Sequence, residues 1–390
     1  EISQLRNALF EIAKQTLEHY DEICEEDLRS LGQLTELRHE LRKHSPLAET
    51  NVMKLYSYID ELLDSIKDHG TPQFTRQARC AFMARSFCRT LVEKGYFTKQ
   101  EMDDFMLSIP TVASEFERDF DLYSHGKLSR DDFNHLYGHL RLGTYDIRSD
   151  SYRNIYFDVA SANLTGNNKV KQEAKSLDLE RLQVALDEAG IPVTPEKFIE
   201  FIKKATQNRE YFKFEFTKSL SLMLDVIVKL GEVMAIARED MSYLEIQDLL
   251  SYHSRDSYIQ TIETRRRFYH VNSYLVLPEV IFDVGDIDVI DIDEARPNFI
   301  TNKVVEAPIV NLDEDHDSDI TGKIVALTKA DPGYDWIFAK DIAGFVTKYG
   351  GAASHMAIRC AEFGIPAAIG CGEKIYQRIH RMQIMCLDCE

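Results

Sequence analysis

The chain is 390 residues long, which is enough for two or three domains. Its formal net charge of −19 argues against a general nucleic-acid binder, and no apolar run approaches the roughly 20 residues that cross a bilayer. Seven scattered cysteines and the lack of a signal-peptide pattern favour a reducing cytoplasm over a secreted, disulfide-stabilised protein. Because the chain begins at Glu1 within a helical pattern, we expect further residues before it.

Helical periodicity dominates the first 282 residues. Apolar side chains recur every three or four positions among charged ones, and plain helical-bundle packing accounts for them. Towards the end of this region, the basic triplet Arg265–Arg267 precedes a strand-like run, VNSYLVLP. We predict helices over 1–44, 51–69, 72–95, 98–123, 129–136, 176–189, 209–238 and 238–252.

One loop between the helical segments concentrates polar side chains. It runs from Tyr137 to Arg153 and contains two glycines. Arginine can hold a carboxylate or phosphate through two N–H groups, and histidine can accept a proton from a nucleophile. A solvated connector between helices fits the same composition equally well. The candidate binding groups are His139, Arg141, Tyr145, Asp146 and Arg153.

An acidic, extended segment separates the helical region from a region with short strand-like runs. We place the boundary near Pro297 and predict a helical region over 1–282, a linker over 283–298 and a small domain over 299–390. Beyond the linker, four β-prone runs alternate with two helical segments. The predicted fold is therefore multidomain, with a mostly α-helical N-terminal region followed by a small α/β domain of roughly ninety residues.

The most informative stretch is FVTKYGGAASHMAIRCAEFGIPAAIG, residues 345–370. It predicts a strand, a turn at Gly350 and Gly351, and a helix capped by Ser354 and ended by Gly364. His355 then lies at the first turn of that helix, where unpaired N–H groups and the helix dipole favour an anion. Its imidazole is nucleophilic near neutral pH and can carry a phosphoryl group. A cap or a surface histidine is the simpler alternative.

The complete string is more specific than its histidine. The pattern T-x-x-G-G-x-x-S-H-x-A-I, followed by E-F-G-I-P-A-x-x-G, closely resembles the phosphohistidine swivelling domain of phosphoenolpyruvate-utilising enzymes. That family includes phosphoenolpyruvate synthase, pyruvate phosphate dikinase and rifampicin phosphotransferase. The resemblance implies that His355 is phosphorylated and that Thr347, Gly350, Gly351 and Ser354 surround the phosphate. The family commonly has Ala-Arg-Glu before Gly-Ile-Pro, whereas this chain has Cys360-Ala361-Glu362, with Arg359 as the nearest arginine.

The family plan has three parts: an ATP-grasp domain that phosphorylates the histidine, a domain that holds the acceptor or pyruvate, and the swivelling carrier. The chain shows no recognisable ATP-grasp pattern and no barrel of alternating strands and helices. We therefore expect the rifampicin-phosphotransferase-like layout, with an ATP-grasp domain missing from the N-terminal side. The resemblance implies ATP and Mg²⁺, held mainly by that domain, and we name no metal ligands in this chain.

We expect a small-molecule acceptor, and a more detailed resemblance of the polar loop and of the segment before the small domain indicates which one. The polar loop resembles the GHR-x-P-G-E-x-D segment of rifampicin-phosphotransferase-like enzymes, and Arg141, Thr144-Tyr145-Asp146 and Arg296–Thr301 resemble glutamine kinases. This implies the side-chain amide of L-glutamine as acceptor, with His139 as base and Arg141 or Arg153 steadying charge. A phosphoenolpyruvate synthase-like enzyme and a non-catalytic phosphorelay or partner-binding module remain alternatives.

Overall fold

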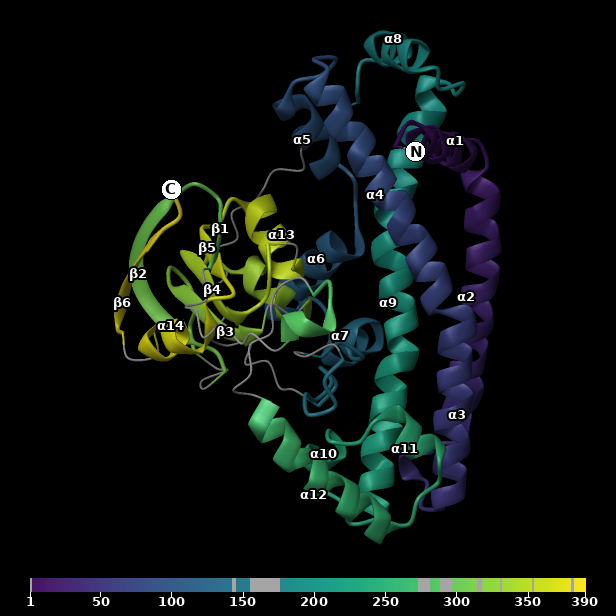
Figure 1. The fold of residues 1–390 in the computed structure, drawn as a ribbon, viewed down its shortest axis with the longest axis vertical. Helices are drawn as coiled ribbons and strands as arrows, with labels where there is room; N and C mark the ends of the chain where they lie inside the picture. Colours follow the sequence, from purple (N-terminus) through teal and green to yellow (C-terminus); the bar gives the residue numbers. More distant parts are fainter. Residues whose placement is uncertain are drawn as a thin grey trace. The chain divides into compact units, whose positions relative to one another are not determined.

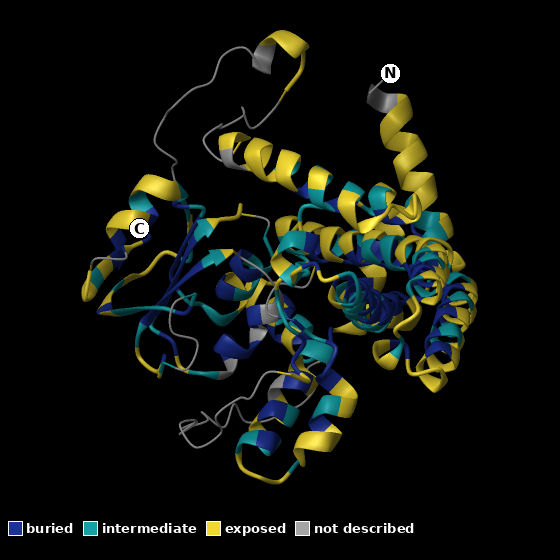
Figure 2. Cartoon of the chain, turned by 90° about the horizontal axis from the view of Figure 1, so that it is seen from below, coloured by how far each residue is buried: buried dark blue, intermediate teal, exposed yellow. Residues whose placement is uncertain are grey.

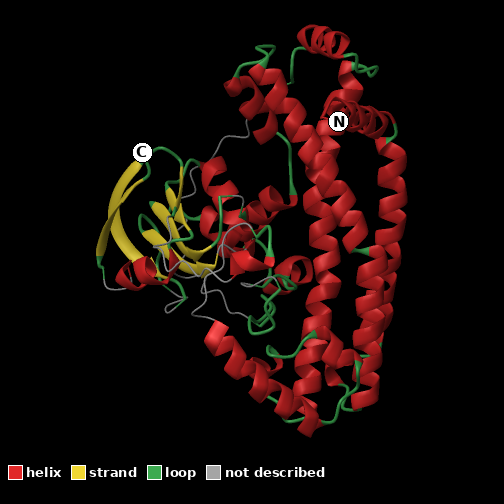
Figure 3. Cartoon of the chain, in the orientation of Figure 1, coloured by secondary structure: helices red, strands yellow, loops and turns green. Residues whose placement is uncertain are grey.

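The computed structural model describes residues 2–141, 145–154, 176–272, 281–287, 297–313, 318–329, 332–352, 354–379 and 382–390. The chain forms two compact units. The first comprises Glu1–Glu49, Met53–Arg118 and Asn167–Val226, and the second Thr50–Val52, Asp119–Gly166 and Ile227–Glu390. Helices build the first unit, whereas every described strand belongs to the second (Figures 1 and 3). A helical region followed by a small α/β domain was predicted, and this is confirmed.

The first unit is built mainly from long helices. They are α1 (Ile2–Glu18), α2 (Tyr20–Lys43), α3 (Val52–His69), α4 (Thr71–Glu93), α5 (Lys99–Leu107), α8 (Leu179–Ala189) and most of α9 (Pro195–Val233), with a 3₁₀ turn at Pro46–Ala48. Two boundaries differ from the prediction. The helix expected over 1–44 is interrupted at His19, and the segment 209–238 is part of one 39-residue helix that begins at Pro195 and ends at Val233. Within the described residues, no helix is long and apolar enough to cross a bilayer.

Apolar and aromatic side chains of α2, α4, α8 and α9 form the core of this unit. Tyr20 meets Phe201 edge to face with ring centroids 4.9 Å apart, and Phe87 lies against Phe198 at 5.5 Å. Burial of such side chains contributes about 25 cal/mol for each Å² of apolar surface removed from water. Most of α1 is exposed, in contrast to the buried inner faces of the long helices (Figure 2).

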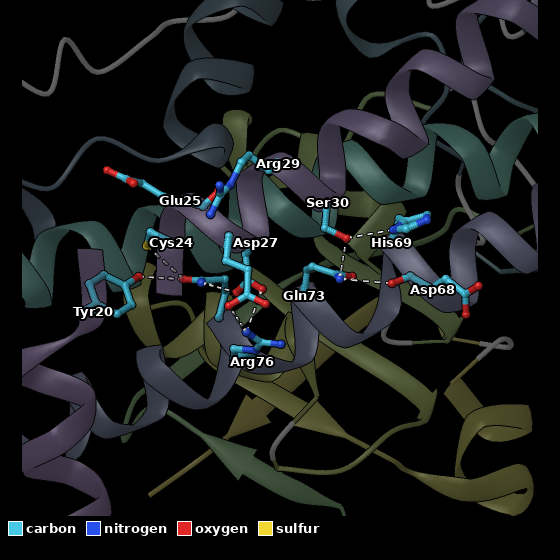
Figure 4. A network of polar contacts seen from close by, with 12 residues as sticks. Tyr20, Cys24, Glu25, Asp27, Arg29, Ser30, Asp68, His69, Gln73 and Arg76 are labelled. Carbon is cyan, nitrogen blue, oxygen red and sulfur yellow. Dashed lines mark hydrogen bonds and ion pairs between the residues drawn. The ribbon is translucent and has the colours of Figure 1, made fainter. Parts of the chain in front are cut away.

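A polar network crosses the same core (Figure 4). The Tyr20 hydroxyl donates to Gln77 Oε1 at 2.7 Å, and Gln77 Nε2 donates to Asp27 Oδ2 at 2.7 Å. Arg76 Nη1 lies 3.4 Å from the other Asp27 oxygen, and Asn208 Nδ2 donates to the Tyr20 hydroxyl at 3.2 Å. These contacts join α2, α4 and α9. Burial raises the pKa of Asp27 and of Tyr20.

The second unit contains shorter helices beside the sheet. They are α7 (Arg130–Tyr137), α10 (Arg238–Met241), α11 (Ile246–Leu250) and α12 (Arg255–Asn272), together with the end of α6 (Val112–Ser124) and a 3₁₀ turn at Val284–Ile287. The single helix predicted over 238–252 is two short helices. The strand-like run predicted from Val271 begins inside α12, which ends at Asn272, and the rest of that run lies outside the described residues. Arg265 and Arg266 of α12 pair with Asp248 and Asp240.

The sheet has six strands in the order β1-β5-β4-β3-β2-β6. The strands are β1 (Asn298–Ile300), β2 (Val304–Asn311), β3 (Ile324–Lys329), β4 (Gly344–Tyr349), β5 (Ala367–Ile369) and β6 (Ile384–Asp388). The central four are parallel, and β1 and β6 add antiparallel edges. The four longer strands were predicted, whereas the three-residue β1 and β5 were not.

Helical segments cover both faces of this sheet. On one face α14 (Gly372–Ile379) packs through Tyr376 and Ile379 onto Ala326, Val346 and other strand residues. On the other face α13 (His355–Phe363) lies against the 3₁₀ segment Pro332–Ala339, where Phe338 stacks on Phe363 at 5.3 Å. Because both faces are covered, β3 and β4 are buried over four consecutive residues.

Candidate active site

The carboxyl ends of the parallel strands meet at one edge of the sheet, where α/β folds usually bind ligands. At this edge β3 ends at Lys329 and β4 at Tyr349, and these two residues are partners in the parallel register. The connection from β4 then passes through Gly350 and Gly351 to His355, the first residue of α13. The sheet therefore presents the predicted histidine at the edge where a ligand is expected.

The turn after β4 is held by the turn after β5. Gly350 has φ of +134°, and Gly370 has φ of +78°. A Cβ added to Gly370 would lie 2.4 Å from the Gly350 carbonyl oxygen. The buried Thr347 completes this junction, because its Oγ1 accepts from the Gly370 N–H at 3.1 Å and its carbonyl accepts from Cys371 N–H at 2.8 Å. Three residues of the motif thus build the turn itself.

Gly351 differs from Gly350 and Gly370 in its surroundings. A Cβ added to Gly351 would meet nothing within 4 Å, and the residue is exposed. Its carbonyl accepts from the Ser354 N–H at 2.9 Å, which brings the chain round to the helix. Ser354 is the predicted N-cap: its backbone is extended and its Oγ accepts from Ala357 N–H at 3.4 Å. Gly351 therefore borders open space beside the start of α13.

His355 is half-buried at the first position of α13. The partial positive charge of a helix N-terminus stabilises an anion at this position. Arg359 follows one turn later on the same side of the helix, and its guanidinium lies over the Phe363 ring at 4.6 Å and pairs with Glu362 at 3.1 Å. Ala361, where the family arginine is expected, is exposed and on another side of the helix. Arg359 therefore does not occupy the position of that arginine.

Hydrogen bonds hold together the described parts of the polar loop predicted to bind the acceptor. Arg141 is 1% exposed, and its Nη1 donates to the Ser149 carbonyl at 2.6 Å. The Tyr152 N–H donates to the Leu140 carbonyl at 2.7 Å, and Arg141 pairs with Ser151 through an isolated β-bridge. The Arg141 guanidinium thus supports the two sides of the loop. Residues 142–144, which include Thr144, lie outside the described residues.

The other candidate groups of the loop occupy two kinds of environment. His139 is 6% exposed, whereas Tyr145 is 57% exposed and Arg153 is also exposed. Asp146 accepts from the Arg148 side chain at 3.0 and 2.7 Å and from the Arg148 N–H at 3.0 Å. The hydrogen bonds from Arg148 hold the pKa of the Asp146 carboxyl well below its usual range. Tyr145 and Arg153 are therefore the candidates accessible to a solute.

Sequence reasoning missed two features of the sheet edge. Lys329 Nζ lies 3.1 Å from Asp146 Oδ2, which joins the edge to the polar loop within the second unit. Beside it, Asp313 Oδ2 accepts from the Thr328 N–H and hydroxyl, both at 2.5 Å, and from the Tyr376 hydroxyl at 3.2 Å. The signal available in the sequence was the position of these residues directly after, or at the end of, parallel strands.

Side chains that could together bind a metal ion are not clustered in the described residues. The described residues contain no group of three or more histidine, cysteine, aspartate or glutamate side chains that could hold one. Octahedral Mg²⁺ takes oxygen ligands, commonly one or two carboxylates with water and substrate phosphates. The described part of the chain does not offer a dedicated metal site.

Comparison with known proteins relates the C-terminal part of the chain to one family. Residues 320–390 match the family model described as PEP-utilising enzyme, mobile domain. A rifampicin phosphotransferase of Bacillus subtilis (strain 168) is 27% identical over 222 residues, which cover 52% of this chain and 24% of that protein. A rifampicin phosphotransferase of Bacillus cereus is 26% identical over 212 residues, covering 49% of this chain and 24% of that protein. The matched region thus spans about a quarter of each relative. Residues 320–390 of the chain are thus similar to the mobile domain of phosphoenolpyruvate-utilising enzymes.

Proposed function

We propose that this chain is the C-terminal part of an ATP-dependent phosphotransferase that passes a phosphoryl group through His355 to a small-molecule acceptor. One observation carries the proposal. Within the family match, His355 begins a helix beside a glycine turn whose Gly351 borders open space. A phosphoryl group on the imidazole gains the field of the helix N-terminus, and the turn leaves room for donor and acceptor to approach.

In the first step a ring nitrogen of His355 attacks the β-phosphorus of ATP, so that an N–P bond forms as the bond from this phosphorus to the α-phosphate oxygen breaks. AMP leaves with the electron pair, and water then cleaves the outer phosphate from the pyrophosphorylated imidazole, which releases phosphate and leaves one phosphoryl group on His355. Holding the imidazole and phosphoryl group in line supplies most of the catalysis, as in other phosphoryl transfers. ATP and Mg²⁺ belong to a donor domain of the ATP-grasp class outside this chain. The domain over 299–390 is the swivelling carrier, linked through 283–298 to the helical region over 1–282.

In the second step an acceptor atom attacks the phosphorus, the N–P bond breaks and the imidazole of His355 leaves. The acceptor loses a proton, for which His139 is the proposed base. Two features support the polar loop as the acceptor site: it belongs to the same compact unit as the sheet, and Asp146 reaches Lys329 at the edge that carries His355. Tyr145 and Arg153 contact the acceptor, and Arg141 shapes the loop. The proposed acceptor is the side-chain amide of L-glutamine.

The experiment has two parts. The chain is first treated with phosphoramidate, a chemical phosphoryl donor to histidine, and acid-labile phosphate is located by mass spectrometry. We expect modification at His355, its loss in His355→Ala, and its retention in His139→Ala. If acid-labile phosphate is not found on His355, or if His355→Ala is labelled as strongly as the natural chain, His355 is not the carrier.

The second part uses the complete natural protein with ATP. We expect AMP and phosphate to accumulate only when L-glutamine is added, and His139→Ala to slow transfer more than phosphorylation of His355. Dependence on pyruvate instead would identify a phosphoenolpyruvate synthase-like enzyme. Phosphorylation of His355 without any acceptor-dependent turnover would identify a phosphorelay module.

A further inference from the structure

Lys329 occupies a particular place at the carboxyl edge of the sheet. It ends β3 and is the register partner of Tyr349, the last residue of β4. Neighbouring strands lie about 4.8 Å apart, so Lys329 stands one strand away from the turn that leads to His355. Its side chain is about half exposed, at 52%, and its ammonium is a flexible point charge. A group that contacts Lys329 therefore contacts the edge that carries the histidine.

The group that does so is Asp146. Its Oδ2 lies 3.1 Å from Lys329 Nζ, although the two residues are 183 positions apart in the chain. Both belong to the second compact unit. The contact therefore joins the polar loop directly to the strand end beside β4.

The loop holds Asp146 in place independently of Lys329. Arg148 donates three hydrogen bonds to its carboxylate, and the Ser149 N–H donates to the Asp146 carbonyl at 3.1 Å. Arg141 then fixes Ser149 through the carbonyl bond. The Asp146 side chain is only 20% exposed. The aspartate is a rigid, ionised acceptor and the lysine is the adaptable partner, which is the arrangement expected where two elements must associate and separate.

We propose that the Asp146–Lys329 ion pair docks the His355 edge of the sheet against the polar loop for the transfer to the acceptor. This inference rests on the function proposed above and gives both residues a positioning role. Partly exposed ion pairs favour the paired state by about two- to fivefold. Such a bias holds the carrier at the acceptor yet lets it leave for the donor, whereas a stronger contact would slow the return.

Docking is tested by zero-length cross-linking in the natural chain. A water-soluble carbodiimide converts a carboxylate and an amine in contact into an amide, so Lys329 and Asp146 should yield one cross-linked peptide pair in mass spectrometry. Lys329→Arg keeps the charge but supplies no amine, and should lose this product. Raising the salt concentration should reduce it, because exposed ion pairs are screened. Mixing ¹⁵N-labelled and unlabelled protein shows whether the link lies within one molecule.

A purely structural contact is separated from a positioning role by the kinetics. After charging with phosphoramidate, Lys329→Met should slow transfer from His355 to L-glutamine two- to fivefold, with the same initial labelling, and Lys329→Arg should restore the rate. Cross-linking without any effect of Lys329→Met on transfer overturns the proposal. So does charging of His355 with no cross-link at low salt, which leaves the proposed function standing. A cross-link in a chain whose His355 is never labelled has the opposite meaning: the contact exists and the proposed function fails.

Discussion

Two regions of this molecule concentrate polar side chains within ordered structure, and they use them differently. In the helical unit Tyr20, Gln77 and Asp27 lie in the core and satisfy one another through bonds of 2.7 Å. At the sheet edge the motif residues Thr347 and Gly350 build a turn, and Gly351 faces open space. Buried polar groups that pair internally specify packing. A catalytic site instead combines a backbone turn held by hydrogen bonds with space beside it that a ligand can enter.

The helical network also illustrates why a cluster of polar side chains does not by itself identify a functional site. Asp27 is 1% exposed and contacts Gln77 and Arg76, so a solute would have to displace these partners to reach it. Removing one member leaves its buried neighbours with fewer hydrogen bonds, which is costly. The glycine turn behaves oppositely, because its exposed glycine can be altered without disturbing a neighbour. Substitutions in the helical network should therefore lower stability without affecting phosphorylation of His355, whereas substitutions at the glycine turn can affect phosphorylation.

The largest effect is expected from Gly370→Ala. The new Cβ would lie 2.4 Å from the Gly350 carbonyl oxygen at a residue with φ of +78°. A left-handed backbone costs an L-residue about 1–2 kcal/mol, and overpacking adds about 1–3 kcal/mol. The free energy of unfolding of the sheet should therefore fall by about 2–5 kcal/mol. Hydrogen exchange of β4 and β5 peptides measures this loss, and labelling of His355 should fall with it.

Gly351→Ala is the matched control, since its Cβ would meet nothing within 4 Å. It should leave exchange of the sheet unchanged. Any fall in labelling of His355 then reports contact with the phosphoryl donor or acceptor. Equal protection in Gly370→Ala and the natural chain would show that the two turns are not coupled as described.

An intermediate effect is expected from Gln77→Leu. The substitution keeps a side chain of similar volume at a fully buried position but removes the hydrogen bonds that Gln77 makes to the Tyr20 hydroxyl and to Asp27 Oδ2. Each orphaned buried group costs about 1–3 kcal/mol, so the helical unit should lose about 2–4 kcal/mol. Exchange of α2 and α4 peptides should accelerate while His355 labels normally. Reduced labelling with an intact sheet would show that the regions are coupled.

The smallest effect concerns pH. Burial raises the pKa of Asp27, so the folded chain binds this proton more tightly than the unfolded chain. Its stabilising contribution is then complete below the ordinary carboxyl pKa of 3.8 and is lost as pH rises through the raised value. The stability of the natural chain relative to Asp27→Asn, measured by urea unfolding of the helical unit, should fall across this window. A rise would mean that the Arg76 ion pair outweighs burial.

Local patterns predicted much of the fold. Helical periodicity located most helices, but the break at His19 has no glycine or proline to signal it. The three-residue strands β1 and β5 are too short to show alternation. The helix α12 continues where a strand was predicted to begin, and partners on α10 and α11 hold its arginines. For the strands the short length of the element outweighed the local signal, and for α12 the ion pairs to α10 and α11 support the helix.

The candidate site divides in the same way. The position of His355, the cap at Ser354 and the turn at Gly350 follow from residues within one short string, because neighbouring residues determine backbone geometry. Burial of Arg141 inside the loop could not be read from its sequence, since arginine serves equally as a ligand group and as a buried support.

The sequence by itself determined a strand, a glycine turn and a helix that begins at a histidine, because these depend on bonds between residues close in the chain. Only the tertiary structure decided that Gly370 packs on Gly350 and that Asp146 reaches Lys329 across 183 positions. Such pairings depend on how strands and loops pack, and packing brings together residues whose separation in sequence carries no signal of their contact.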